Sequence, residues 1–91
     1  MLIVVSYDIP DDRRRTRLSD MLKNFGQRVQ YSVFECRLDA GDLERLKASV
    51  ARIIDAAEDA VRIYRLCAEC AGNVVIQGLG KVTEDPEVYV L

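Results

Sequence analysis

At the start of the chain the hydrophobic residues first form a strand-like run and then recur with a helical period. Residues 2–7 form a mostly apolar run rich in β-branched side chains, which is typical of a strand. An aspartate at position 11 or 12 then caps a predicted helix that ends before Gly26. The apolar side chains of this helix follow i, i+3, i+4, i+7 spacing and predict one buried stripe: Leu18, Met21, Leu22 and Phe25.

The middle of the chain repeats this order. Residues 28–38 are strand-like, but they contain no Gly, Pro or Asn, so the pattern fits one bent strand or two short ones. Asp42 is the predicted cap of a second helix, and residues 61–66 return as a strand. The stripe of this second helix comprises Leu43, Leu46, Val50, Ile53, Ile54 and Ala57.

This order predicts an α+β fold, a ferredoxin-like βαββαβ sandwich with a mainly antiparallel sheet and both helices on one face. The first strand is apolar on both sides, so its second face needs a cover, and a homodimer packed sheet to sheet supplies one. Residues 74–77 and 88–91 resemble short strands that need a sheet edge. We therefore expect a single domain over residues 1–91, with a core at 1–66 and a segment at 73–91 that adds a strand to the partner's sheet.

Length and charge narrow the class of protein. With 91 residues, 31% charged residues and 49% hydrophobic residues, the chain has the composition of one small globular domain. It shows no apolar run long enough to cross a bilayer and no secretory signal pattern, so we expect a cytoplasmic protein. The net charge is -2, yet residues 1–37 hold seven of the 13 Lys and Arg and five of the 15 Asp and Glu. A local basic face is therefore expected within an acidic total.

The chain contains no histidine and three cysteines. Without histidine, acid–base chemistry would rest on carboxylates and metal-bound water. Cys67 and Cys70 have the C-x-x-C spacing of redox and zinc sites, but one chain lacks the fourth ligand of a structural zinc site. We expect all three cysteines, Cys36 included, to be buried as small apolar side chains.

The candidate chemistry lies where the first strand meets the first helix. Arg13, Arg14 and Arg15 fall in the first turn, where the helix dipole disfavours cations, so we expect an anionic ligand to compensate them. Asp8 has two interpretations. It accepts local backbone bonds or caps the coming helix, or it faces its symmetry mate in a two-fold dimer and shares a magnesium ion.

Several motifs in order resemble the CRISPR-associated protein 2 family, over essentially the whole chain. They are Tyr7-Asp8-Ile9 with the following aspartates and arginines, Gly26 with residues 28–35, Gly78-Leu79-Gly80, and residues 86–90. The resemblance implies a ferredoxin-like homodimer whose C-terminal strand joins the partner's sheet. It implies either a magnesium-dependent endonuclease acting on single-stranded RNA or double-stranded DNA, or a bridge between dimers of the CRISPR-associated protein 1 integrase that holds prespacer DNA.

The resemblance also assigns roles to particular residues. Asp8 of each subunit would hold the magnesium ion, with Tyr7 beside it. Residues tied to nuclease function would be Arg15, Arg17, Arg28 and Phe34, and the nucleic-acid contacts would be Arg13, Arg14, Arg15 and Arg17. Phe34 is either a stacking surface or a core residue. A toxin-like ribonuclease and a small-molecule-binding regulatory domain of the same fold remain alternatives.

Overall fold

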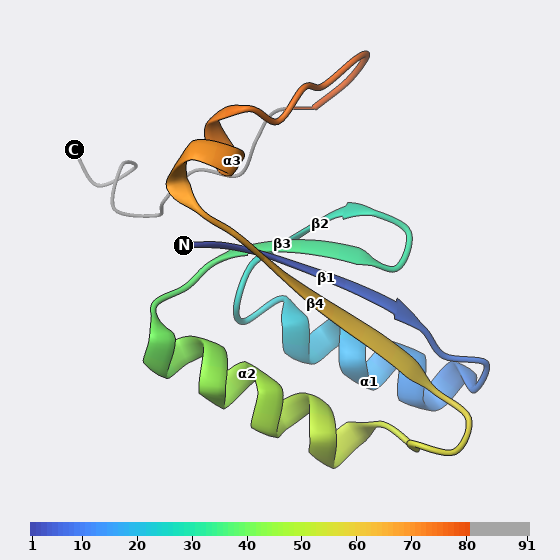
Figure 1. Ribbon diagram of the computed structural model, residues 1–91. Coiled ribbons are helices and arrows are strands. Elements are labelled where there is room, and N and C mark those ends of the chain that lie inside the picture. The colour runs from blue at the N-terminus through green and yellow to red at the C-terminus, as the bar shows by residue number, and fades with distance from the viewer. Residues whose placement is uncertain (81–91) are drawn as a thin grey trace.

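The computed structural model describes residues 1–80 of the chain (Figure 1). Its elements are β1 (Leu2–Asp8), α1 (Asp12–Leu22), β2 (Gln27–Gln30), β3 (Val33–Arg37), α2 (Ala40–Ile53), β4 (Ala60–Leu66) and α3 (Ala68–Gly72). The sheet order is β2-β3-β1-β4, and every neighbouring pair is antiparallel. Helices α1 and α2 lie side by side on one face of this sheet. The predicted ferredoxin-like arrangement is confirmed.

The core fills the space between the sheet and the two helices. Alternate residues of β1 point toward the helices, so Ile3 and Val5 meet the stripes of α1 and α2. Phe34 is 0% exposed and belongs to this core. On the opposite face of β1, Leu2 is also fully buried and Val4 is half-buried. The second apolar row of β1 is therefore partly covered within one chain.

The strand-like stretch after α1 is a hairpin of two short strands. Tyr31 and Ser32 separate β2 from β3, and Ser32 has a positive φ of 64°. Glycine or asparagine usually occupies such a position. Because neither is present, the sequence did not indicate where the turn lies. The Ser32 carbonyl accepts a hydrogen bond from the Tyr7 amide at 3.0 Å, which fixes the turn beside the end of β1.

Both long helices begin at an aspartate. Asp11 caps α1 and accepts from the Arg14 amide at 2.9 Å, as expected. The predicted cap of α2 was wrong, because Asp39 rather than Asp42 caps it and accepts from the Asp42 amide at 2.7 Å. The first turn of α2 contains only small residues before Leu43, so the apolar pattern starts later than the helix.

The sequence prediction assigns residues 74–77 to a strand on the partner's sheet, and a single chain leaves this a prediction. Residues 74–77, expected as a strand, have no strand pairing within residues 1–80. A strand needs a partner for its backbone groups, and neither edge of this sheet pairs with the segment. The short helix α3 was not predicted, since five residues are too few to show periodicity. The strand expected at residues 88–91 lies outside the described residues.

Candidate nucleic-acid interface

The Tyr7-Asp8 pair at the end of β1 divides between the two faces of the sheet. Tyr7 is buried on the helix face, where its ring lies 6.4 Å from the ring of Phe34. Asp8 is exposed, and strand alternation directs it to the opposite face. Residues that are adjacent in the sequence therefore serve two separate surfaces.

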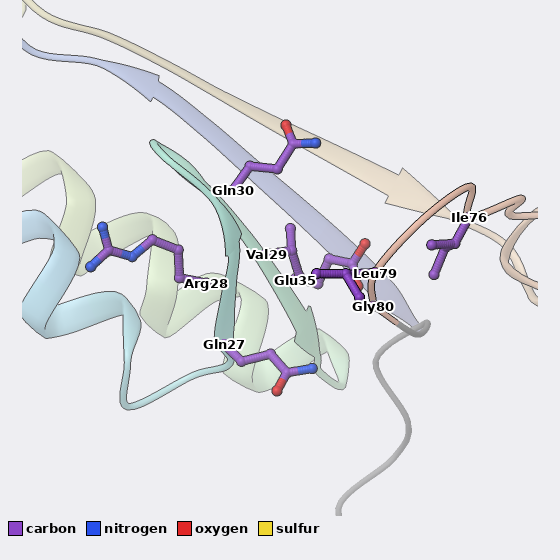
Figure 2. Close-up of a pocket in the computed structure, with 8 residues that line it drawn as sticks. All are labelled: Gln27, Arg28, Val29, Gln30, Glu35, Ile76, Leu79 and Gly80. Carbon is purple, nitrogen blue, oxygen red and sulfur yellow. The ribbon is translucent and has the colours of Figure 1, made fainter.

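A groove lies on the helix side, between α1 and the β2–β3 hairpin. Tyr7 lies at its base, and the cations Arg15, Lys23 and Arg28 line it together with Tyr31. Figure 2 shows Arg28 extending from β2 toward α1, away from Ile76. The side chain of Tyr31 is 73% exposed, which is unusual for a large aromatic residue. The groove thus combines positive charge with an open aromatic face.

The Arg15 guanidinium is fixed at the groove by two contacts within the chain. Its Nη1 donates to the Ile9 carbonyl at 3.0 Å, and its Nη2 forms an ion pair with Asp12. The hydrogen bond to Asp12 raises the pKa of Arg15, which therefore stays charged. Lys23 contacts Asp20 at 3.4 Å, and Asp20 is the only carboxylate among the residues that line this groove.

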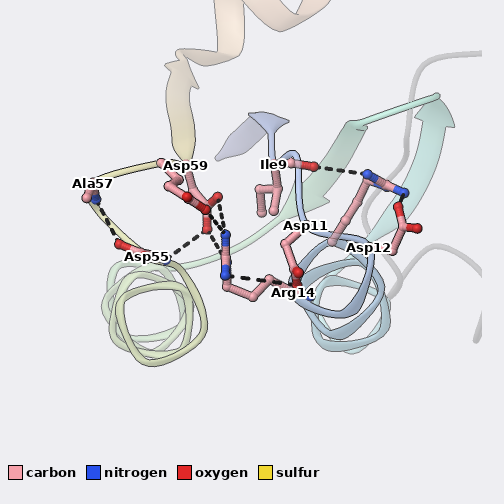
Figure 3. A network of polar contacts seen from close by, with 9 residues as sticks. Ile9, Asp11, Asp12, Arg14, Asp55, Ala57 and Asp59 are labelled. Carbon is pink, nitrogen blue, oxygen red and sulfur yellow. Dashed lines mark hydrogen bonds and ion pairs between the residues drawn. The ribbon is translucent and has the colours of Figure 1, made fainter.

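Arg14 was expected to bind an external anion, and the structure corrects this prediction. Its Nε donates to Asp59 Oδ2 at 2.8 Å and its Nη2 donates to Glu58 Oε2 at 2.8 Å (Figure 3). Asp59 also accepts from the Asp55 amide at 2.8 Å. The carboxylates that compensate this arginine come from the α2–β4 loop, which was too distant in sequence to be linked to α1. Arg14 joins two parts of the fold.

We predict that Asp59→Asn lowers the unfolding midpoint more than Glu58→Gln. The Asp59 side chain is 0% exposed, whereas that of Glu58 is 61% exposed and is easily replaced by water. Bonding to Arg14 lowers the pKa of Asp59, so the carboxylate stabilises the folded chain above its unfolded pKa and loses that effect as pH falls through the folded pKa. Urea titrations at neutral pH and below about pH 4 should show the Asp59→Asn deficit shrinking in acid. An equal deficit at both pH values would contradict this role.

The remaining predicted arginines occupy a third surface. Arg13 and Arg17 lie four residues apart on the exposed side of α1, around a shallow hollow with Thr16. Neither forms an ion pair within residues 1–80. They are available to a partner, but they do not line the groove of Arg15 and Arg28.

Burial decides two further expectations. Phe34 is enclosed in the core, which confirms the core alternative and excludes a stacking surface. Cys67 and Cys70 are exposed, against the expectation, because they lie at the start of α3 beyond the main core. Cys36 is buried as expected, and burial raises the pKa of its thiol to about 11.

The metal expectation was tested against the ligands that one chain offers. Residues 1–80 contain no group of three or more Cys, Asp or Glu side chains placed to hold a metal ion. The Asp8 carboxylate has no hydrogen bond or ion pair within this range. One carboxylate alone is a poor magnesium site, and one chain supplies only one of the two carboxylates expected.

Lys23 and Tyr31 were missed by sequence reasoning. Lys23 falls just beyond the end of α1, and Tyr31 opens a turn that carries no glycine. The polar residues that flank Tyr31, Gln30 and Ser32, were a weak signal that this part of the stretch is exposed. The groove also brings together Tyr7, Arg15 and Arg28, which the sequence had singled out.

These features define a class: a small ferredoxin-like domain with a basic groove beside its hairpin and an unpartnered aspartate on the other face. The family model described as CRISPR associated protein Cas2 matches residues 1–74. The chain belongs to the Cas2 family.

Relatives and solved structures agree along nearly the whole chain. A Chloroflexus aurantiacus protein named CRISPR-associated endoribonuclease Cas2 3 is 47% identical over 91 residues, covering 100% of this chain and 98% of its own. A Thermus thermophilus protein named CRISPR-associated endonuclease Cas2 2 is 49% identical, covering 99% and 96%. The crystal structure of Streptococcus pyogenes Cas2 at pH 6.5 has a TM-score of 0.75 at 30% identity, covering 86% and 100%.

A chain in a structure described as a partial Cas6-RT-Cas1–Cas2 complex is also similar. Its TM-score is 0.71 at 29% identity, covering 82% of this chain and 88% of that one. Within residues 1–80, helices fall short of the length and apolar character that a membrane span requires.

Proposed function

We propose that this Cas2 family member binds nucleic acid and bridges dimers of the Cas1 integrase during spacer acquisition. The observation that carries the proposal is the groove in which Arg15, Lys23 and Arg28 surround an exposed Tyr31. The similar chain in a complex described as containing Cas1 supports the assembly role.

The chemistry of the groove suits an unpaired strand. Cations along the groove bind phosphates through charge-assisted hydrogen bonds, while an aromatic ring stacks on any base. Arg15 is already oriented by the Ile9 carbonyl, so less side-chain entropy is lost when it contacts a phosphate. We infer that the ligand is a single-stranded segment, such as an unpaired end of prespacer DNA or a single-stranded RNA.

We further propose a homodimer formed through the open face of the sheet. Val4 and Tyr64 are paired neighbours on this face, and Tyr64 is 47% exposed. The segment 73–91 would add a strand to the partner's sheet. A second copy would bring a second Asp8 to the assembly.

Tyr31→Ala should weaken binding of a single-stranded oligonucleotide by about 5- to 150-fold, since a stacked base is worth about 1–3 kcal/mol. Tyr31→Phe keeps the ring and should bind as the wild type does. Lys47→Gln, on α2 outside the groove, serves as the control. Fluorescence anisotropy at fixed salt measures all four dissociation constants, and equal values for wild type and Tyr31→Ala would exclude stacking at this position.

A second proposed function is magnesium-dependent endonuclease activity. Relatives are named endonuclease or endoribonuclease, and Asp8 is an exposed carboxylate with no partner within residues 1–80. Asp8 of two copies would hold one magnesium ion. When bound, magnesium neutralises phosphate charge and lowers the pKa of water.

A further inference from the structure

Cys67 and Cys70 form an exposed dithiol for which the proposed function has no use. Cys67 is the N-cap of α3, and its Sγ accepts a hydrogen bond from the Cys70 amide at 3.4 Å. The two side chains also contact each other through a thiol–thiol hydrogen bond. Both are exposed within the described residues, and Cys36 is enclosed in the core.

We propose that Cys67 and Cys70 are a reversible redox site, which closes to an intramolecular disulfide by exchange with a small-molecule disulfide of the glutathione class. Cys67 Sγ lies 3.4 Å from the Cys70 amide, the two thiols are in hydrogen-bond contact and exposed, and two residues separate them, which is the spacing of dithiol redox pairs. The next residues of the chain, 73–80, leave the sheet from this junction. Closure would therefore stiffen the point where the C-terminal segment departs.

The two cysteines have different roles in the exchange. The Cys67 thiolate attacks a sulfur of oxidised glutathione, forms a mixed disulfide and releases one glutathione thiolate. Cys70 then gives its proton to water and attacks the Cys67 sulfur, which releases the second glutathione thiolate. Two protein thiols lose two electrons, and one glutathione disulfide becomes two molecules of reduced glutathione.

Local hydrogen bonds support this order of attack. Hydrogen bonds from the Cys70 backbone and thiol lower the pKa of Cys67, while the same thiol–thiol contact raises the pKa of Cys70. Cys67 is therefore the more readily ionised of the two thiols, and the thiolate is the attacking form. A structural zinc site needs four ligands, and these two thiolates supply only two of them. This favours a disulfide over a metal site.

The test uses the full chain in glutathione redox buffers, with acid quenching and mass spectrometry. We expect oxidised glutathione to remove two hydrogen atoms from the protein through a Cys67–Cys70 linkage, and reduced glutathione to restore them. Cys70→Ser should accumulate a mixed disulfide at Cys67, and Cys67→Ser should react several-fold more slowly. Cys36→Ser should behave as the wild type does.

Two outcomes would contradict the proposed redox site. One is a chain that gains a separate glutathione on each cysteine without forming the internal linkage. Another is a chain that binds zinc through these thiols and resists oxidation. Neither result would bear on the proposed function, because the Tyr31 variants test nucleic-acid binding and the Asp8 variant tests cleavage, both on other surfaces.

Discussion

Gly26→Ala is expected to destabilise the protein by about 3 kcal/mol, since forcing a methyl group into a packed site is costly. A Cβ at Gly26 would lie 2.6 Å from Cys36 Sγ and 2.8 Å from Cys36 Cα, and it would lie closer still to the Glu35 carbonyl oxygen. Two of these atoms belong to the backbone of β3 and cannot rotate away. For a domain of this size the unfolding midpoint should fall by roughly 12 °C or more.

The same substitution should affect the groove. Gly26 directly precedes β2, so relief of the clash would displace the strand that carries Arg28. Gly72→Ala is the matched control, because a methyl group there meets no atom within 4 Å. Thermal unfolding at one protein concentration compares the three chains. Equal midpoints for wild type and Gly26→Ala would mean that Gly26 and β3 do not approach as closely as described.

Asp8→Asn is expected to abolish magnesium-dependent cleavage while leaving nucleic-acid affinity unchanged. Asparagine keeps the size of the side chain but removes the charge that holds a hard cation. Because Asp8 lies on the face opposite the groove, loss of its charge should not alter nucleic-acid binding. Cleavage of RNA and DNA substrates should be measured in parallel with the dissociation constant.

A second readout separates the metal from the activity. If Asp8 holds magnesium, the ion should raise the unfolding midpoint of the wild type and leave that of Asp8→Asn unchanged. Glu44→Gln is the matched control, because Glu44 is an exposed carboxylate on α2 outside the groove. Equal cleavage by wild type and Asp8→Asn would trace the activity to a contaminant. Equal loss of affinity and cleavage would remove the proposed separation of surfaces.

The element order was predictable because each helix has a clear apolar stripe and each long strand is rich in β-branched residues. Leu18 and Leu22 are buried as the spacing required. Two short strands were one of the alternatives predicted for residues 28–38, but the turn between them could not be located, since a serine with positive φ carries no residue signal. The cap at Asp39 was missed because the first apolar residue of α2 follows only at Leu43.

The candidate site was predictable in its residue types and less so in its geometry. Side chains alternate between the two faces of a strand, so Tyr7 and Asp8 lie on opposite faces of the sheet. The motif was interpreted as one site, and this separation was overlooked. The partners of Arg14 lie more than forty positions away, so only the packed fold reveals them. Phe34 shares a strand motif with exposed residues, and its burial depends on which face the helices cover.

The salt dependence of single-strand binding tests the central claim, that the groove beside the hairpin is the nucleic-acid surface. Each phosphate contact on a single strand contributes about 0.7 to the slope of log affinity against log salt. The double variant Lys23→Gln/Arg28→Gln should therefore lower the slope by roughly 1.4. Lys47→Gln, on α2 outside the groove, should leave the slope unchanged. A double variant with the wild-type slope, or an equal decrease in Lys47→Gln, would contradict binding in the groove.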